Sequence, residues 1–123
     1  MAYSPKAEKK RIRKIAKDWQ DVLALYEWEI TTEYVDGPLL VDGALNRDAA
    51  GCAKVNWQYR SATISFNTQE TAKMSDVELE GCYVHEAMHV LIREMREPDD
   101  DLKHEERTAS TLAWAFLRAR GVR

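Results

Sequence analysis

Two histidines and a glutamate, His85, Glu86 and His89, have a spacing that suits metal chemistry. On a helix, side chains four residues apart lie on the same face, so the two imidazoles can bind a single metal ion. Glu86 directly follows the first histidine, which is the position from which a carboxylate reaches the water that such a metal activates. The spacing therefore predicts a zinc-dependent hydrolase, in the first place a peptidase.

A third metal ligand must come from another part of the chain. Catalytic zinc takes three protein ligands and keeps one position open, so two histidines are not sufficient. The downstream candidates are His104, Glu105 and Glu106. Helical spacing counted back from the apolar positions Ala109 and Phe116 reaches both glutamates. Spacing alone therefore leaves the third ligand open between Glu105 and Glu106.

Helix signals surround the histidine motif. Ser75 and Glu78 form a capping-box pattern, which predicts a helix from Ser75 to about Met95. Its expected apolar stripe comprises Val77, Val84, Met88, Leu91 and Met95. A further helix is expected from about Asp100 to Arg120. Its expected inward residues are Ala109, Leu112, Ala113 and Phe116.

The N-terminal half predicts one more helix and a small sheet. Ser4 and Pro5 mark the start of the helix. Its expected inward residues are Ile12, Ile15, Ala16, Trp19, Val22, Leu23 and Tyr26. Strands are expected at Trp28–Tyr34, Ala49–Trp57 and Ala62–Phe66, with a long loop over 36–48 and a hairpin turn around 58–61. The predicted fold class is α+β, with the helices covering one face of a three-stranded antiparallel sheet.

Length and composition are compatible with a small enzyme. The chain has 123 residues and 45% hydrophobic composition, so we expect a single domain over residues 1–123. No apolar run approaches the roughly 20 residues of a membrane span, and the N-terminus lacks a signal-peptide core, which predicts a cytoplasmic protein without membrane contact. Cys52 and Cys82 are expected to be free thiols. The basic segment Lys6–Lys17 is interpreted as a solvated helix face rather than a nucleic-acid surface.

The histidine motif, followed by the segment Glu106–Ala113, resembles the gluzincin metallopeptidases. It is most similar to the small phage and mobile-element peptidases of the ImmA/IrrE-like group, in which the third-ligand helix carries a glutamate followed by small and polar residues. The resemblance covers roughly residues 75–120. It implies a minimal zincin-like fold that binds one Zn²⁺ ion, with Glu106 as the third ligand.

The resemblance also implies a role for Ser110. This residue stands where the family usually has an aspartate or asparagine that contacts a ligand histidine. A hydroxyl there orients the imidazole more weakly than a carboxylate would. The metzincin peptidases are a poorer match. They carry a glycine and a histidine at the positions that Ile92 and Met95 occupy in this chain.

The resemblance implies a mechanism as well. Glu86 would act as the general base on the metal-activated water and pass the proton to the leaving amine. Candidate donors to the developing oxyanion are Tyr59, Tyr83 and His104. The substrate would add as an extended strand along a sheet edge. The predicted edge strand comprises Ala62, Thr63, Ile64, Ser65 and Phe66.

The expected partner is a peptide or protein substrate, and the resemblance suggests a repressor. Two alternatives remain beside the peptidase. One is a non-catalytic helical scaffold whose basic N-terminal helix binds DNA or a protein, and the other is a zincin fold that has lost activity. Stoichiometric zinc in the purified protein would distinguish the scaffold from the other two.

Overall fold

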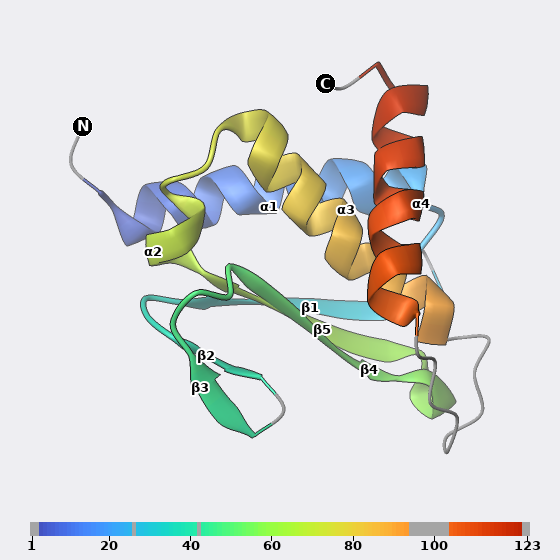
Figure 1. Cartoon of the computed structure of the whole chain (residues 1–123), viewed down its shortest axis with the longest axis horizontal. Coiled ribbons are helices and arrows are strands. Elements are labelled where there is room, and N and C mark those ends of the chain that lie inside the picture. The colour runs from blue at the N-terminus through green and yellow to red at the C-terminus, as the bar shows by residue number, and fades with distance from the viewer. Residues whose placement is uncertain (1–2, 26, 42, 94–103, 122–123) are drawn as a thin grey trace.

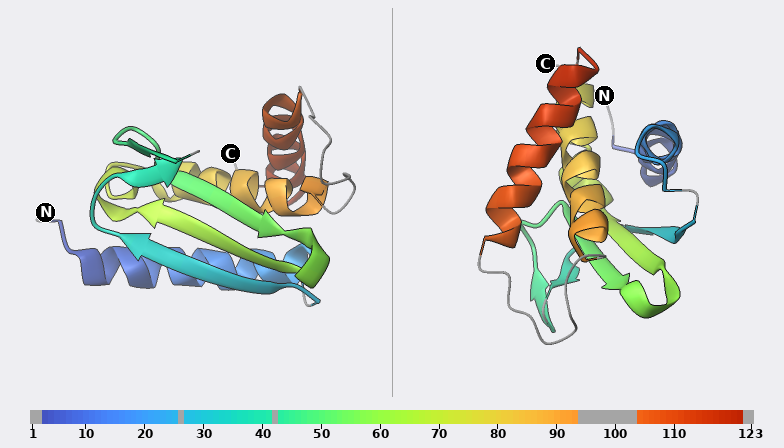
Figure 2. Two further views of the ribbon diagram at one scale, coloured as in Figure 1. Left: turned by 90° about the horizontal axis from the view of Figure 1, so that it is seen from below. Right: turned by 90° about the vertical axis from the view of Figure 1, so that its right-hand side faces the viewer.

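The computed structural model describes residues 3–25, 27–41, 43–93 and 104–121, and these form an α+β fold around a small mixed sheet (Figure 1). Helix α3 lies between α1 and α4, and both α1 and α3 cover the same face of the sheet (Figure 2). The elements are α1 (Pro5–Val22), β1 (Glu29–Val35), β2 (Leu39–Val41), β3 (Ala44–Asn46), β4 (Gly51–Asn56), a 3-10 turn η1 (Trp57–Tyr59), β5 (Ser61–Asn67), α2 (Thr68–Thr71), α3 (Asp76–Arg93) and α4 (Glu105–Ala119). The predicted α+β class is therefore confirmed.

The sheet differs from the predicted antiparallel arrangement. Its strand order is β1-β5-β4, in which β5 pairs in parallel with β1 and antiparallel with β4. The predicted hairpin between β4 and β5 is present, so these two consecutive strands run in opposite directions. On its other side β5 pairs with β1, which is not its neighbour in the chain, and these two strands run in the same direction.

The prediction that Ala62–Phe66 forms an edge strand is wrong. These residues lie in β5, which is bonded to β1 on one side and to β4 on the other. The alternation that suggested a strand arises because Ala62, Ile64 and Phe66 face the covering helices and are buried. The outer strands of the sheet are β1 and β4.

The predicted loop over 36–48 contains a second, two-stranded sheet. Strands β2 and β3 pair antiparallel, with Leu40 opposite Leu45. Leu39 is buried whereas Leu40 is exposed, so only one face of this short hairpin packs on the rest of the protein. Three-residue strands are too short to establish a clear alternation, so no sequence pattern predicted them.

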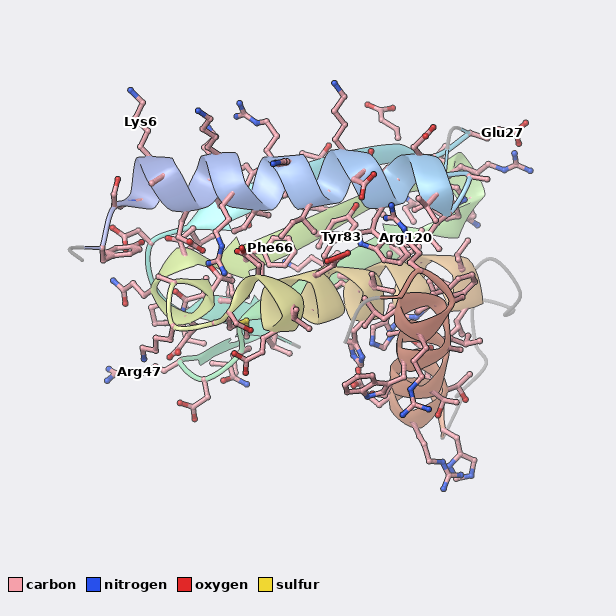
Figure 3. The ribbon with its side chains drawn as sticks, turned by 90° about the horizontal axis from the view of Figure 1, so that it is seen from above. Lys6, Glu27, Arg47, Phe66, Tyr83 and Arg120 are labelled. Carbon is pink, nitrogen blue, oxygen red and sulfur yellow. The ribbon has the colours of Figure 1, made fainter. Side chains whose placement is uncertain are left out.

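One hydrophobic core joins α1, β5, α3 and α4. Phe66 of β5 and Tyr83 of α3 stack in this core, with ring centroids 6.1 Å apart (Figure 3). The largest fully buried side chains are Trp19, Tyr83, Phe66, Ile12 and Ile64. Burial of each such side chain contributes about 1.5–3 kcal/mol.

The predicted helix faces are confirmed only in part. In α4, Ala109 and Ala113 are buried, but Leu112 and Phe116 are exposed and Leu117 is buried instead. The buried positions of α4 follow one row of residues four apart, since this helix packs mainly along α3. Val22 in α1 and Val77 in α3 are also exposed. Tyr26 and Met95 lie outside the described residues.

The two helix starts predicted from capping residues are confirmed, whereas the expected start of the last helix at about Asp100 lies outside the described residues and α4 is described from Glu105. Ser4 caps α1 by accepting a hydrogen bond from the backbone N–H of Ala7. At α3, the backbone N–H of Glu78 donates to Oγ of Ser75, and the backbone N–H of Ser75 donates to Oε1 of Glu78. This reciprocal capping box fixes where α3 begins and thereby which face carries the histidines.

Neither cysteine takes part in a disulfide, as the sequence predicted. No helix in the described ranges is long and apolar enough to cross a membrane.

A buried carboxylate ties α1 to the chain that enters α3. Glu8 accepts hydrogen bonds from Nη1 of Arg11 at 2.8 Å and from Oγ1 of Thr71 at 2.6 Å. The same guanidinium donates through Nη2 to the backbone carbonyl of Met74 and through Nε to Asp76. Arg11 therefore neutralises a buried charge and holds the residues that precede α3.

We predict that Arg11→Met lowers the free energy of unfolding by about 2–4 kcal/mol, because it leaves the Glu8 carboxylate buried without its cation. Urea denaturation followed by circular dichroism measures the change. The matched control is Arg13→Met on the exposed face of α1, which should change stability by less than about 0.5 kcal/mol. Equal effects of the two substitutions would contradict this role of Arg11.

Candidate metal centre

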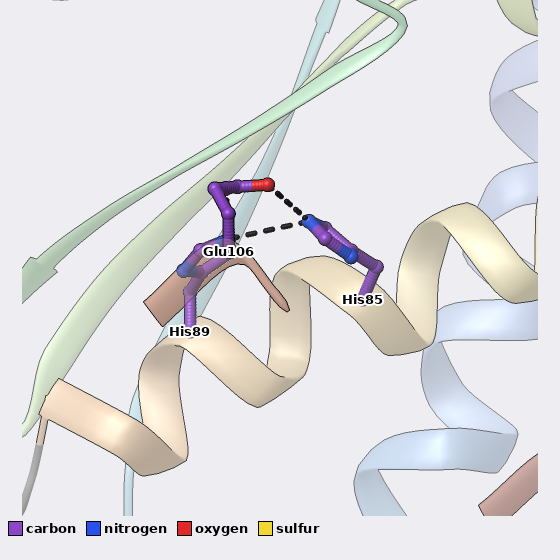
Figure 4. Close-up of side chains that lie close together, drawn as sticks. All are labelled: His85, His89 and Glu106. Carbon is purple, nitrogen blue, oxygen red and sulfur yellow. Dashed lines mark hydrogen bonds and ion pairs between the residues drawn. The ribbon is translucent and has the colours of Figure 1, made fainter. Parts of the chain in front are cut away.

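Three donor groups from two helices converge at one point (Figure 4). His85 and His89 project from α3, and Glu106 projects from the first turn of α4. The two Nε2 atoms lie 3.3 Å apart. Oε2 of Glu106 lies 3.2 Å from Nε2 of His85, and Oε1 lies 2.7 Å from Nε2 of His89. The donors predicted from the sequence are therefore brought together by the packing of α4 on α3.

The opposite nitrogen of each imidazole is held by a residue of α4. Nδ1 of His89 lies 2.6 Å from Oε2 of Glu105, and Nδ1 of His85 lies 3.3 Å from Oγ of Ser110. A partner at Nδ1 fixes the orientation of the ring and leaves Nε2 directed at the shared point. Ser110 thus contacts a candidate ligand histidine, as the resemblance implied.

The structure distinguishes Glu105 from Glu106, which spacing alone did not. Adjacent helix positions differ in direction by about 100°, so the two glutamates of α4 face different surroundings. Glu105 is buried against α3, where Nε of Arg93 lies 3.2 Å and 3.1 Å from its two carboxylate oxygens. Glu106 is largely exposed and directs its carboxylate at both histidines. Glu105 therefore orients a histidine, and Glu106 completes the donor set.

Electrostatics favour the charge states that metal binding requires. Burial of Glu105 by itself would raise its pKa, but the hydrogen bond to His89 and the charge of Arg93 lower the pKa below its usual value. Burial also lowers the pKa of His85, against the raising effect of the Glu106 charge. A neutral imidazole is the form that binds a metal ion. The site thus holds a carboxylate at Glu105 and favours a neutral ring at His85.

The donor set fits zinc. Two imidazole nitrogens and one carboxylate oxygen are the ligand types of known catalytic zinc sites. Tetrahedral ligands at roughly 2.0–2.1 Å from zinc lie about 3.3 Å from one another. The two Nε2 atoms lie 3.3 Å apart and Oε2 of Glu106 lies 3.2 Å from Nε2 of His85, which agrees with that value, whereas Oε1 of Glu106 lies closer, at 2.7 Å from Nε2 of His89. Oε2 is therefore the carboxylate oxygen whose spacing from His85 suits a zinc ligand.

Glu86 lies beside the donors but is not one of them. Its side chain is buried, and burial raises its pKa to about 7, with a further raising effect from Glu106 and an opposing effect from His89. The start of β4 passes close by: a Cβ atom at Gly51 would lie 3.3 Å from Cγ of Glu86 and 3.2 Å from Sγ of Cys82. A group with a pKa near neutrality suits general base catalysis, because it can accept and release a proton at physiological pH.

The three candidate oxyanion donors are not placed at the site by any described hydrogen bond. The Tyr83 side chain is fully buried in the core, and its hydroxyl accepts a hydrogen bond from Nε2 of Gln20 on α1. For Tyr83 the prediction is therefore wrong, since the hydroxyl points at α1. Tyr59 is exposed in the η1 turn, and His104 is exposed just before α4.

Two features of the site escaped the sequence prediction. The pair formed by Arg93 and Glu105 spans two helices, and residues 94–103 between them contain no pattern that would have indicated this contact. Gly51 allows β4 to approach α3, but a glycine in a strand has several other common explanations. Both Glu105 and Glu106 were candidates from the sequence. Only the packing of α4 shows that their side chains face different surroundings.

Comparison of the chain with protein-family models, with curated proteins and with solved structures finds no match. The interpretation of the site therefore depends on its geometry and on the residue pattern.

We predict that Glu86→Gln stabilises the metal-free protein at alkaline pH. Because the folded-state pKa of Glu86 is raised, the native protein retains this proton more tightly, and the associated stability is present below about pH 4.5 and is lost as the pH rises through about 7. Glutamine has no charge to bury, so the variant should gain roughly 2–3 kcal/mol over the parent at pH 8 and little at pH 4.5. Urea denaturation in the presence of a chelator, at both pH values, measures the difference. A gain that does not depend on pH would contradict the proposed burial of charge.

Proposed function

We propose that this protein is a zinc-dependent metallopeptidase of the gluzincin type, similar to the small ImmA/IrrE-like peptidases. The observation that carries the proposal is the convergence of Nε2 of His85, Nε2 of His89 and the Glu106 carboxylate beside the buried Glu86. A metal site for structure alone would have no need of a buried carboxylate next to it that is not a ligand. The order of sheet, motif helix and third-ligand helix supports a minimal zincin-like fold.

In this proposal His85, His89 and Glu106 hold the zinc ion. When bound, the ion supplies Lewis-acid chemistry: it polarises the substrate carbonyl and lowers the pKa of a water molecule towards about 7. Glu86 then accepts a proton from the attacking water and donates it to the leaving amine. Glu105 and Ser110 keep the two imidazoles in place during the reaction.

Strand β4, rather than the predicted β5, is the edge along which a peptide would bind. Among the described residues, the only strand that pairs with β4 in the main sheet is β5. Gly51 at its start lies against Glu86, so the strand passes directly beside the proposed base. An extended peptide that adds to the outer side of β4 would have its backbone hydrogen-bonded there and its scissile bond near Glu86. We propose a peptide or protein substrate, and a repressor protein is the kind that the resemblance suggests.

We predict that Glu106→Ala removes stoichiometric zinc from the purified protein, because one of three ligands is lost. Glu105→Gln should retain zinc with an affinity about 10–100-fold weaker, since only the orientation of His89 is affected. Metal analysis by mass spectrometry, with competition against a zinc chelator, measures both. The opposite order of effects would make Glu105 the third ligand.

We predict that Glu86→Gln lowers kcat/KM for peptide hydrolysis by a factor of about 10²–10⁴ without loss of zinc. The glutamine side chain cannot accept the proton of the attacking water, although it occupies a similar volume. A mixed fluorogenic peptide library provides the assay. The matched control is Glu80→Gln on the same helix, where the side chain accepts a hydrogen bond from Trp19. Full activity of Glu86→Gln would show that Glu86 is not the base.

A further inference from the structure

The outer face of α1 has a continuous basic stripe of exposed lysine and arginine side chains. They recur three and four residues apart, so they share one face of the helix and extend roughly 16 Å along its axis. Figure 3 shows Lys6 extending from α1 away from α3. The exposed acids of the helix, Asp18 and Asp21, come only after the last member of the stripe. The basic stripe comprises Lys6, Lys9, Lys10, Arg13, Lys14 and Lys17.

No acid of α1 neutralises this stripe. The single acid within the run is Glu8, which is buried and accepts a hydrogen bond from Arg11. Among the described residues, no side chain of the stripe forms an ion pair. Lys9 lies over the ring of Tyr34, 5.3 Å from the ring centroid, and that ring is uncharged. The positive charge of the stripe is therefore left to be neutralised by something outside the chain.

The stripe destabilises the helix that contains it. Like charges four residues apart repel each other on a helix, and Lys6 also lies in the first turn, where the helix dipole disfavours a cation. A helix face that only meets water usually alternates in sign, because opposite charges at this spacing attract. The interpretation of this segment as a solvated helix face does not account for that difference. The like-charged pairs are Lys6 with Lys10, Lys9 with Arg13, Lys10 with Lys14, and Arg13 with Lys17.

The charge is also separated from that of the rest of the chain. The whole protein has a formal net charge of -3 at pH 7, so acids predominate outside α1. In Figure 2, α1 lies at an outer side of the protein, with α3 between it and α4. A cationic face on an acidic protein attracts a polyanion to that face alone.

The surroundings of the stripe favour duplex DNA among the polyanions. The stripe has no exposed aromatic ring on which single-stranded bases could stack, and no apolar residue that could anchor a protein. The apolar face of α1, with Ile12, Ala16 and Trp19, is buried in the core and cannot insert into lipid. A single helix fits the major groove of B-form DNA, about 12 Å wide, whereas the major groove of duplex RNA is too narrow.

We propose that the basic stripe of α1 binds the phosphate backbone of double-stranded DNA without sequence specificity. Duplex DNA has one negative charge per roughly 1.7 Å of its axis, so the length of the stripe spans more phosphates than it has cations. Contacts to phosphates position a protein on DNA and do not read its sequence. The inference is independent of the proposed peptidase function, because the stripe and the candidate metal centre share no residue.

Fluorescence anisotropy of a labelled, mixed-sequence DNA duplex of about 20 base pairs, titrated with the full chain, tests this binding. We expect saturable binding with a Kd on the order of 10 μM at about 50 mM NaCl. The slope of log K against log salt concentration should lie between about −3 and −5, because each phosphate contact releases a counterion. No saturable binding under these conditions would overturn the inference.

The variant Lys10→Glu/Arg13→Glu separates binding from folding. It converts all four like-charged pairs into opposite pairs, so Tm should not fall, whereas DNA affinity should weaken about tenfold or more and the salt slope should shrink by about 2. The matched control is Lys54→Glu/Arg107→Glu, which changes the net charge equally at exposed positions outside α1. It should weaken binding by less than about threefold. Equal weakening by the two variants would overturn the assignment to the stripe.

Other polyanions provide the remaining comparison. Single-stranded DNA of the same sequence, duplex RNA and vesicles that contain phosphatidylserine should each bind more weakly than duplex DNA. Equal or tighter binding of any of them would overturn the assignment to duplex DNA. None of these measurements involves the metal, so a protein that fails to bind zinc or to cleave peptides would leave the inference standing.

Discussion

The packing of α4 along α3 is the interaction on which the candidate site depends. One row of α4 residues, Glu105, Ala109, Ala113 and Leu117, is buried, and small side chains in its middle allow the two helices to approach closely. The row begins with Glu105, which binds His89 and Arg93 of α3. This contact fixes the rotation of α4 and places the next residue, Glu106, against both histidines. The donor set therefore results from helix packing rather than from a preformed loop.

Several positions of α3 are unfavourable for stability. The helix buries the Glu86 carboxylate, whose raised pKa reflects an unfavourable environment for charge. It also contains Gly81 in its interior and exposes Val77 beside an open cavity. The capping box at Ser75 and Glu78 and the network around Arg11 stabilise the start of the same helix. The proposed catalytic role of α3 would explain this distribution, with local costs near the candidate site and strong contacts away from it.

Local patterns predicted much of this fold, and long-range pairing accounts for the errors. Capping residues and helical periodicity were sufficient to locate α1 and α3, because both signals act within a few residues. The parallel pairing of β1 with β5 depends on contacts between segments about thirty residues apart, so alternation within each strand could not show it. Leu112 and Phe116 are exposed for a related reason. Helix α4 packs mainly along α3, so only a narrow row of its residues is buried and the rest of its predicted apolar face is not.

The site was predictable in its residue types and not in its arrangement. The histidine spacing predicted a metal site and the structure brings its candidate donors together, but the different surroundings of Glu105 and Glu106 follow from the rotation of one helix. The most direct test of the zinc site is a crystal structure of the zinc-loaded protein with anomalous diffraction measured at the zinc edge. We predict a single zinc peak within bonding distance of Nε2 of His85, Nε2 of His89 and the carboxylate of Glu106. The absence of an anomalous peak at this position, or a zinc ion bound to Glu105 in place of Glu106, would contradict the proposed donor set.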